Sequence, residues 1–399
     1  MIDLAREQEL TPGCRDQVFL DSAGSSLPTR TVVDTVVAHL RREAEIGGYR
    51  AAGERAEDLQ GLSRSVGRLL NCDDDLLAFC DSATRAWSQF VTALSWQAGD
   101  RILMCGNEYA SNAITLLQRR HLDGAQVEVV PTTADGDADL EALGRMLDER
   151  VRLVSLVHVA TNSGHVSRVR EVVELAHSVG ALVLLDACQS VGQLDIDVEA
   201  LGVDALSATG RKWLRAPRGT GFLYVRRPVL VDLEPIAVDM RGGTWTGAEE
   251  YQLRSDAARF ELWEADVAGR LGLKAAVDHL LDLGPMEVES AIRQRGKLLR
   301  DGLGRLKGVN VHDVGIDLAG IVSFTVDGHK AADVRSALLG VGVTVSVSEL
   351  SSTRLDMAAR DLASVVRASP HYFVGPGQIE AAVTAIARIS DSTTRGQEG

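Results

Sequence analysis

The chain between about residues 75 and 230 repeats one pattern, in which a short apolar run is followed by an amphipathic helical stretch. Several runs are apolar at consecutive positions, as expected of strands buried on both faces. Such alternation predicts an α/β layer with a largely parallel sheet. The strands are expected at 101–105, 126–130, 152–159, 181–186, 204–209 and 221–225, and the helices at 84–96, 110–120, 138–149 and 168–179.

The pattern changes from about residue 270. Long helical stretches over 265–307 precede short β-rich runs and a last helix at 377–389. This order predicts a second, smaller α+β domain. We therefore divide the chain into an N-terminal arm (1–20), a large domain (21–265) and a small C-terminal domain (266–399).

Composition narrows the possible functions. Lysine and arginine total 42 against 56 aspartates and glutamates, and the net charge of −14 argues against nucleic-acid binding as the main role. The start, MIDLAREQEL, lacks the apolar core of a signal peptide, and no apolar run is long enough to span a bilayer. The five cysteines form no C-x-x-C pair and the histidines show no ligand spacing. We expect a cytoplasmic protein without a metal, a membrane or a nucleic acid as partner.

Three features carry candidate chemistry. Asp186 ends an apolar strand, and the carboxyl ends of strands border the ligand crevice of open α/β sheets. Lys212 follows the end of the next strand, and Ser82, Ala83 and Thr84 begin a helix whose free N–H groups could bind phosphate. Taken singly, each has an ordinary structural explanation. Together they match pyridoxal 5′-phosphate (PLP), which needs a carboxylate for its ring nitrogen, a lysine for its aldehyde and a phosphate cradle.

The motifs resemble, in order, those of fold-type I PLP enzymes of aminotransferase class V. The resemblance runs from about residue 18 to 390 and implies a homodimer with shared active sites. Within that group the chain looks most similar to ergothioneine-type C–S lyases, to lincosamide-type S-cysteinyl conjugate lyases and oxidative deaminases, and to isopenicillin N epimerase-like proteins. The motifs are VFLDSAG (18–24), DSATRA (81–86), NEYASN (107–112), HVATNSG (158–164), LLDACQSVGQ (184–193), SATGRKW (207–213) and RASPHYF (367–373).

The resemblance implies a role for each matching residue. Lys212 matches the Schiff-base lysine, Asp186 the partner of the pyridine nitrogen, and Arg367 the arginine that pairs with the substrate α-carboxylate. Ser22, Ala23 and Gly24 are expected to line the substrate mouth. The remaining cofactor contacts are Ser82, Ala83, Thr84, Ser207, Thr209 and Arg211 at the phosphate, Gln189 at the ring 3-oxygen, Tyr109 stacked on the ring, and Thr244, which reaches the phosphate of the other subunit.

Two departures from the family pattern shape the expected reaction. Arg211 stands where many relatives have histidine, and an arginine stabilises negative charge but cannot act as an acid–base group. Cysteine desulfurases need a thiol on the loop before the carboxylate arginine, and the segment 345–369 contains none. We therefore predict that the protein is not a cysteine desulfurase. Cys188 is interpreted as a small buried filler and His158 as a residue near the cofactor.

The reaction expected from the resemblance is β-elimination from an S-substituted L-cysteine conjugate, which yields a thiol, pyruvate and ammonia, in thiol metabolism or antibiotic biosynthesis. Decarboxylating oxidative deamination of such a conjugate, transamination and epimerisation stay open, because Lys212, Asp186 and Arg367 would serve almost any reaction of an α-amino acid. A nicotinamide dehydrogenase is disfavoured, since no G-x-G-x-x-G follows a strand and opens a helix. A non-catalytic binding module is disfavoured because all three residues are present.

Overall fold

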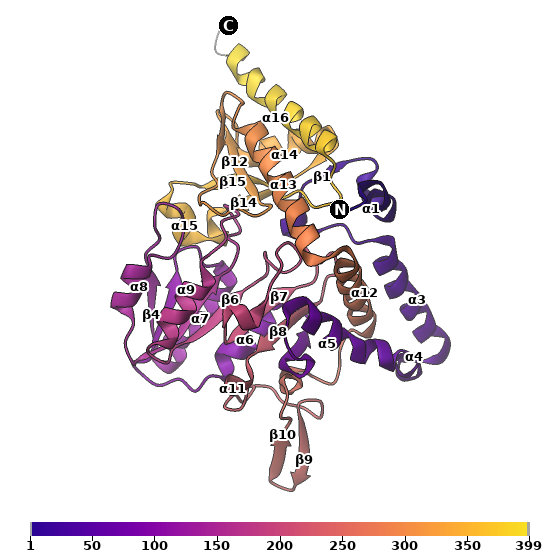
Figure 1. Ribbon diagram of the computed structural model, residues 1–399, viewed down its shortest axis with the longest axis vertical. Helices are drawn as coiled ribbons and strands as arrows, with labels where there is room; N and C mark the ends of the chain where they lie inside the picture. Colours follow the sequence, from indigo (N-terminus) through magenta and orange to yellow (C-terminus); the bar gives the residue numbers. More distant parts are fainter. Residues whose placement is uncertain (1, 397–399) are drawn as a thin grey trace.

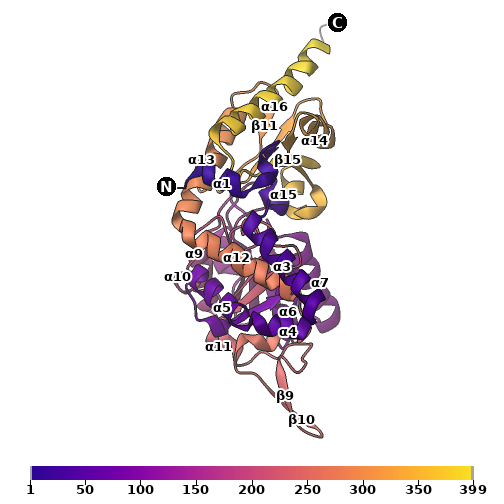
Figure 2. The same ribbon diagram turned by 90° about the vertical axis from the view of Figure 1, so that its right-hand side faces the viewer.

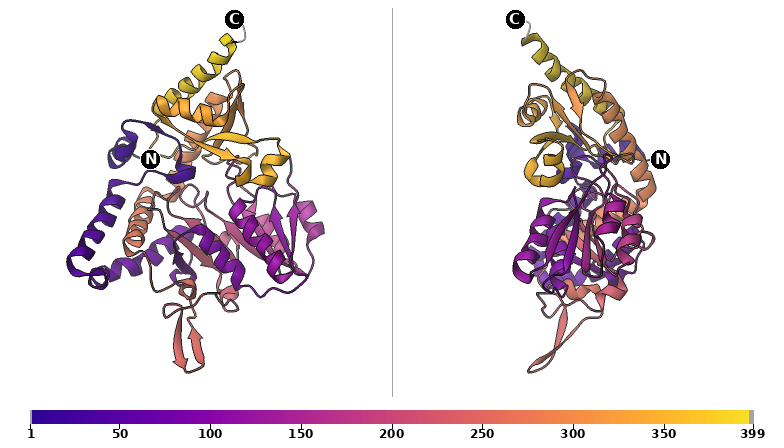
Figure 3. Two further views of the ribbon diagram at one scale, coloured as in Figure 1. Left: turned by 180° about the vertical axis from the view of Figure 1, so that it is seen from behind. Right: turned by 90° about the vertical axis from the view of Figure 1, so that its left-hand side faces the viewer.

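The computed structural model describes residues 2–396. Its core is a seven-stranded sheet in which β8 runs antiparallel to both neighbours and the other pairs are parallel. Helices cover both faces of the sheet (Figure 3). The α/β fold class predicted from the sequence is confirmed. In spatial order the strands are β2 (Leu77–Cys80), β8 (Gly221–Val225), β7 (Ala205–Thr209), β6 (Leu182–Asp186), β5 (Val151–Val157), β3 (Arg101–Cys105) and β4 (Gln126–Val130).

The central strands form where the sequence is apolar at successive positions. Every residue of β3, β7 and β8 is buried, whereas the edge strand β4 keeps only Val130 fully covered. Burial on both faces removes the alternation that a half-exposed strand would show. The helices that connect or flank these strands are α6 (Ala83–Ala93), α7 (Ala110–Asp123), α8 (Leu140–Met146), α9 (Val169–His177), α10 (Val198–Leu201) and α11 (Arg227–Leu230).

A second group of helices packs beside this layer (Figure 2). It comprises α3 (Arg30–Ile46), α4 (Gly48–Glu54), α5 (Ala56–Leu70) and α12 (Val267–Leu283). Helix α12 lies against α3 and α5. By packing, α12 therefore belongs with the large domain, although the predicted boundary at 265/266 falls before it. The chain leaves the large domain at Gly284, whose φ of 87° ends α12, and Pro285 starts the next helix.

The small domain is built on a four-stranded antiparallel sheet (Figure 1). The N-terminal arm joins it, because β1 (Val18–Phe19) pairs in parallel with β13 (Val343–Thr344). Residues far apart in sequence are thus brought together close to the cavity described below. The sheet order is β11 (Val309–Val311), β12 (Val322–Val326), β15 (Ser364–Ala368) and β14 (Ser346–Glu349), and the helices are α13 (Pro285–Leu303), α14 (Ala331–Gly340), α15 (Arg354–Ala359) and α16 (Pro376–Gly396).

One feature was absent from the sequence-based prediction. A two-stranded hairpin of β9 (Gly243–Gly247) and β10 (Glu250–Leu253) projects from the body, at the bottom of Figure 1. It exposes 81% of Trp245 and 54% of Tyr251. Among the described helices, none combines the length and apolar character needed to cross a membrane.

Candidate active site

A cavity of about 280 Å³ lies at the carboxyl ends of the central strands. The ends of the parallel strands β6 and β7 meet there, together with the N-terminal ends of α6 and α7. Ten of the residues predicted to hold the cofactor line it. They are Ser82, Ala83, Thr84, Tyr109, Asp186, Gln189, Ser207, Thr209, Arg211 and Lys212.

Lys212 sits on a tight turn after β7. The turn is closed by a hydrogen bond of 3.0 Å from the Arg215 N–H to the Lys212 carbonyl. Burial lowers the pKa of Lys212, and the negative charge of Asp186 acts in the opposite direction. No described side chain forms a hydrogen bond with Lys212 Nζ. A desolvated amine of this kind is available as a nucleophile and as a proton carrier.

Asp186 is held at both carboxylate oxygens. Its Oδ1 accepts a hydrogen bond of 2.8 Å from the Cys188 N–H, and its Oδ2 accepts one of 2.8 Å from Asn112 Nδ2. Only 6% of Asp186 is exposed. The two donors fix the orientation of the carboxylate at the strand end, where a carboxylate is needed to pair with the pyridine nitrogen of PLP.

Gln189 is fixed from three directions. Its Nε2 donates to Thr161 Oγ1 at 3.0 Å and to the Ala23 carbonyl at 3.1 Å, while its Oε1 accepts from Trp213 Nε1 at 2.9 Å. These bonds link the strand loops to the N-terminal segment and to the lysine turn. The amide therefore has a defined orientation toward a ligand.

One end of the cavity is formed by the start of α6. Ser82 is its N-cap, with its hydroxyl accepting from the Arg85 N–H at 3.3 Å. A side chain on Gly221 would place its Cβ 2.7 Å from the Ser82 carbonyl carbon, so only glycine lets β8 approach this helix end. Ser207 and Thr209 lie two apart on β7 and face the same cavity, as the strand period requires.

The predicted substrate-binding residues contact the wall of the cavity without lining it. Arg367 Nη1 on β15 donates to Thr161 Oγ1 at 2.9 Å. The Gly24 carbonyl accepts from Arg211 Nη1, as the Ala23 carbonyl does from Gln189. Ser22 differs from the expectation, because its buried hydroxyl pairs with Ser26 at 3.1 Å. The backbone of this segment, rather than the Ser22 side chain, reaches the wall.

Two expected residues lie away from the cavity of their own chain. Thr244 is exposed on the hairpin strand β9, and its contact with another subunit stays a prediction. His158 does not line the cavity, although its neighbours Val157 and Val159 do. Burial lowers the pKa of His158 to about 4. A chain that extends past β5 turns successive side chains to opposite sides, which explains the difference.

Sequence reasoning missed several polar residues of the site. Asn107, Asn112 and Thr161 line the cavity, and so does Cys188, which was interpreted as a filler. Behind Asn112 lies Glu108, which is 3% exposed. The sequence offered little signal for the pair of Glu108 and Asn112, because Glu108 lies in the loop before α7 and only Asn112 is on the helix.

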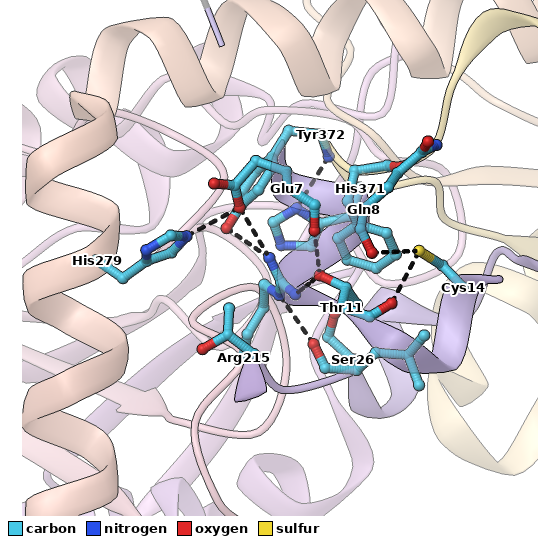
Figure 4. Close-up of polar contacts among 12 residues, drawn as sticks. Glu7, Gln8, Thr11, Cys14, Ser26, Arg215, His279, His371 and Tyr372 are labelled. Atoms are coloured by element: carbon cyan, nitrogen blue, oxygen red, sulfur yellow. Dashed lines mark hydrogen bonds and ion pairs between the residues drawn. The ribbon is translucent and has the colours of Figure 1, made fainter. Parts of the chain in front are cut away.

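Arg215, three residues after Lys212, connects the lysine turn to three other segments (Figure 4). Its φ of 62° is in the left-handed region. Its Nε donates to the Leu27 carbonyl at 2.8 Å, its Nη1 to Tyr372 at 2.7 Å and its Nη2 to Thr11. The guanidinium thus joins the N-terminal arm, the segment at Leu27 and the small domain to the turn that carries the lysine.

The residues present fit PLP. The Asp186 carboxylate stands at the end of β6, the desolvated Lys212 follows the end of the adjacent β7, and a helix N-terminus with hydroxyl side chains closes the far end. The described residues contain no cluster of side chains suited to a metal ion.

The chain is similar over nearly its full length to several proteins named as cysteine desulfurases. A probable cysteine desulfurase of Methanothermobacter thermautotrophicus is 29% identical over 371 residues, 91% of this chain and 92% of the relative. A cysteine desulfurase of an Enterobacter species is 28% identical over 390 residues, 93% of each. The Escherichia coli cysteine desulfurase CsdA superposes with a TM-score of 0.90 at 22% identity, covering 97% of this chain and 98% of that one. The cystine C–S lyase C-DES gives 0.86 at 25%, covering 94% and 99%.

These relatives overturn the function predicted from the sequence. The chain was expected not to be a cysteine desulfurase and to act on an S-substituted cysteine conjugate, yet the relatives are named cysteine desulfurases. The prediction was wrong because it rested on one missing thiol in a single loop. Similarity over more than nine-tenths of both chains carries far more information than the absence of one residue.

The family itself is established by a match that covers most of the chain. The sequence model of aminotransferase class V matches residues 18–381. PLP is the cofactor of this fold, and a solved neighbour, a C-DES mutant with a TM-score of 0.87, carries glycine covalently linked to its PLP. The chain therefore belongs to the aminotransferase class V family of PLP-dependent enzymes.

Proposed function

We propose that this protein is a PLP-dependent enzyme that removes sulfur from L-cysteine, as a cysteine desulfurase does. One observation carries the proposal: Lys212 and Asp186 face a single cavity in a chain whose near-full-length relatives are named cysteine desulfurases. When bound, PLP would act as an electron sink for charge that develops on an amino acid.

The binding roles follow from the contacts of each side chain. Asp186 would pair with the pyridine nitrogen and keep it protonated, since both its oxygens are held in place by hydrogen bonds. The start of α6 would bind the phosphate, with Ser207, Thr209 and Arg211 beside it. Gln189 would contact the ring 3-oxygen and Tyr109 would stack on the ring.

Lys212 would move the protons of the reaction. Its lowered pKa places part of its population in the neutral form, which can take the proton from the substrate α-carbon. The same Nζ can return a proton to carbon. Arg367, held by Thr161, would bind the α-carboxylate and so fix the substrate in reach of Nζ.

We propose that the group that accepts the sulfur comes from outside this chain. Its segment 345–369 has no cysteine, and Cys188 is the one cysteine among the described residues that lines the cavity. Burial, followed by the charge of Asp186, raises the pKa of Cys188 well above its ordinary value. A raised pKa keeps the thiol protonated, and a protonated thiol is a poor nucleophile. We infer that a small thiol from solution accepts the sulfur.

The balanced reaction is L-cysteine plus a thiol giving L-alanine plus a persulfide. The external thiolate attacks the cysteine sulfur, the C–S bond breaks, and its electron pair passes to the β-carbon, which is then protonated. The accepting sulfur is oxidised and the carbon is reduced, so no other oxidant is needed.

The test is incubation of the PLP-loaded protein with L-cysteine, with and without a small thiol, followed by amino-acid and sulfide analysis. L-cysteine is itself a small thiol, so the proposal is supported if the rate of alanine formation rises with the added thiol above the rate with L-cysteine alone. The variant Cys188→Ala should keep the activity, whereas Lys212→Ala should lower it by at least ~10³-fold. Pyruvate and sulfide in place of alanine would make the enzyme a cysteine lyase, and no turnover of cysteine would refute the proposal.

We also propose that the protein works as a homodimer. The hairpin β9–β10 extends from the body and exposes Trp245 and Tyr251, aromatic residues that are enriched in interfaces (Figure 1). A second copy of the chain would cover these two aromatic side chains. Thr244 of one copy would then reach the phosphate site of the other copy. Light scattering during gel filtration checks the mass, and a monomer at micromolar concentration would contradict this proposal.

A further inference from the structure

Glu108 is a second buried carboxylate behind Asp186. It follows β3 in the loop before α7, and 3% of it is exposed. Asn112 is 4% exposed and stands between the two acids. Its Nδ2 donates one hydrogen bond of 2.9 Å to Glu108 Oε1 and another of 2.8 Å to Asp186 Oδ2.

The bridge fixes the orientation of the Asn112 amide. An amide nitrogen carries two hydrogens, and both are used here on carboxylate oxygens. If the amide were turned over, its carbonyl oxygen would face both carboxylates and would be repelled by them. Glu108 therefore helps to decide which way Asn112 points, and Asn112 in turn holds Oδ2 of Asp186.

Glu108 has only neutral donors around it. Oε1 also accepts from the Tyr109 N–H at 2.9 Å, and Oε2 accepts from the hydroxyl of Ser155, a fully buried residue of β5. No lysine, arginine or histidine among the described residues forms an ion pair with it. The burial of an acid without an opposite charge is costly, so this arrangement calls for an explanation beyond packing.

We propose that Glu108 is a positioning residue for the cofactor site, which through Asn112 orients the Asp186 carboxylate and adds a titratable negative charge behind the ring nitrogen. Glu108 touches neither the cofactor nor the substrate in this arrangement. It acts on the ring through Asp186. The inference depends on PLP binding at Asp186 and on no particular reaction.

The charge state of Glu108 supports this role. Burial raises its pKa to about 7, with a further rise from the charge of Asp186, while hydrogen bonds from Ser155, Asn112 and Tyr109 lower it. The titratable groups facing it are Asp186 on β6 and Cys105 on β3, and the pKa of Cys105 is itself raised by burial. Glu108 can thus gain or lose its proton near neutral pH without another group that titrates there.

The experiment is a pH titration of the visible absorbance of bound PLP, with no substrate present. In Glu108→Gln, loss of a nearby negative charge should move the midpoint to lower pH and weaken PLP binding by roughly threefold to tenfold. The wild-type inflection that belongs to Glu108 should vanish. A titration and a PLP affinity identical to those of the wild type would refute the inference.

A matched control separates positioning from stability. Glu7→Gln removes a carboxylate that is equally buried, at 1% exposed, but contacts Arg215 and His279 instead of Asp186 (Figure 4). Arg215 keeps its bonds to Thr11, Leu27 and Tyr372 in this variant. The Glu7→Gln variant should unfold at a lower urea concentration, yet its absorbance titration should match that of the wild type. If the midpoint of the absorbance titration shifts equally in Glu7→Gln and Glu108→Gln, the inference is also refuted.

A second variant is available if Glu108→Gln does not fold. Ser155→Ala keeps both carboxylates and removes only the hydroxyl that donates to Glu108 Oε2. The inflection of Glu108 should then move to higher pH, because an anion-stabilising bond is lost. An unmoved inflection would assign the titration to another group. Since no substrate is used, these outcomes are independent of whether cysteine is desulfurated.

Discussion

Glu7 and Glu108 are both buried carboxylates, yet their surroundings differ completely. Glu7, on α1 (Leu4–Leu10), forms ion pairs with Arg215 at 3.6 Å and with His279 at 2.9 Å (Figure 4). Glu108 receives only neutral hydrogen bonds and lies beside another acid. An opposite charge beside a buried carboxyl group stabilises its ionised form strongly. Neutral hydrogen-bond donors stabilise that form less, so the carboxyl group can still bind and release a proton near neutral pH.

The two acids also lie in different parts of the molecule. Glu7 lies where the N-terminal arm, the lysine turn and the small domain meet, and its partner Arg215 also stacks on Phe373, with 4.5 Å from its guanidinium carbon to the ring centroid. Glu108 lies at the carboxyl edge of the sheet, next to the cofactor cavity. The first site holds segments together, and we propose that the second adjusts chemistry.

The largest expected effect comes from breaking the Glu7 site. Arg215→Met leaves the Glu7 carboxylate buried with His279 alone and deprives Tyr372 and the Leu27 carbonyl of a donor. The free energy of unfolding should fall by about 3–5 kcal/mol, as when one member of a buried pair is removed. Urea unfolding measures it. Arg145→Met, at an exposed pair with Glu141, should change stability by less than about 0.5 kcal/mol, and equal losses would contradict the comparison.

The next effect is the contribution of Glu108 to the pH dependence of stability. Its folded pKa of about 7 lies above the ordinary value of 4.5, so between these values the folded state keeps a proton that the unfolded state has released. The stability that Glu108 contributes is therefore fully present below pH 4.5 and is lost as pH rises toward 7, by at most ~1.4 kcal/mol per pH unit.

This slope can be measured by urea unfolding of the cofactor-free protein across that window. Glu108→Gln should remove the part of the slope that Glu108 contributes, because glutamine does not titrate, and leave the part due to other buried acids such as Asp313, whose pKa burial raises to about 6. Glu7→Gln should lower stability but retain the full wild-type slope. If the slope of Glu108→Gln equals that of the wild type, the titration belongs elsewhere and the contrast between the two acids fails.

The smallest effect concerns the second partner of Glu7. His279 has a side chain 20% exposed, so solvent offsets part of its loss. His279→Ala should cost about 1 kcal/mol, whereas His279→Gln, which keeps a donor, should cost less than half of that. Thermal unfolding of both variants checks the order. A cost for His279→Ala equal to that of Arg215→Met would mean that both cations share the carboxylate equally.

Most of the sheet could be predicted from the sequence because most of its strands are buried on both faces. The strands expected at 101–105 and 221–225 agree with the observed β3 and β8, in which every residue is buried. The hairpin β9–β10 escaped prediction, since its strands are largely exposed and carry no apolar run. The pattern reports burial, so elements that are not buried in one chain leave little trace.

The site was predicted unevenly for a similar reason. Residues on ordered motifs, such as Asp186 and Lys212, were identified because motif order survives in the linear sequence. The bridge from Glu108 through Asn112 joins the loop after β3 to the end of β6, and the contact of Glu7 with Arg215 spans more than half of the chain. Neither pairing has a sequence spacing that could reveal it.

The sequence by itself determined the α/β class, the family and the cofactor, because these depend on periodicity and on motifs that are local in the chain. The tertiary structure alone decided which polar groups meet: which acid is paired with a cation, which with an amide, and which thiol faces the cavity. Those contacts set the cost of burial and the pKa of each group, and both quantities depend on neighbours that folding brings from distant positions.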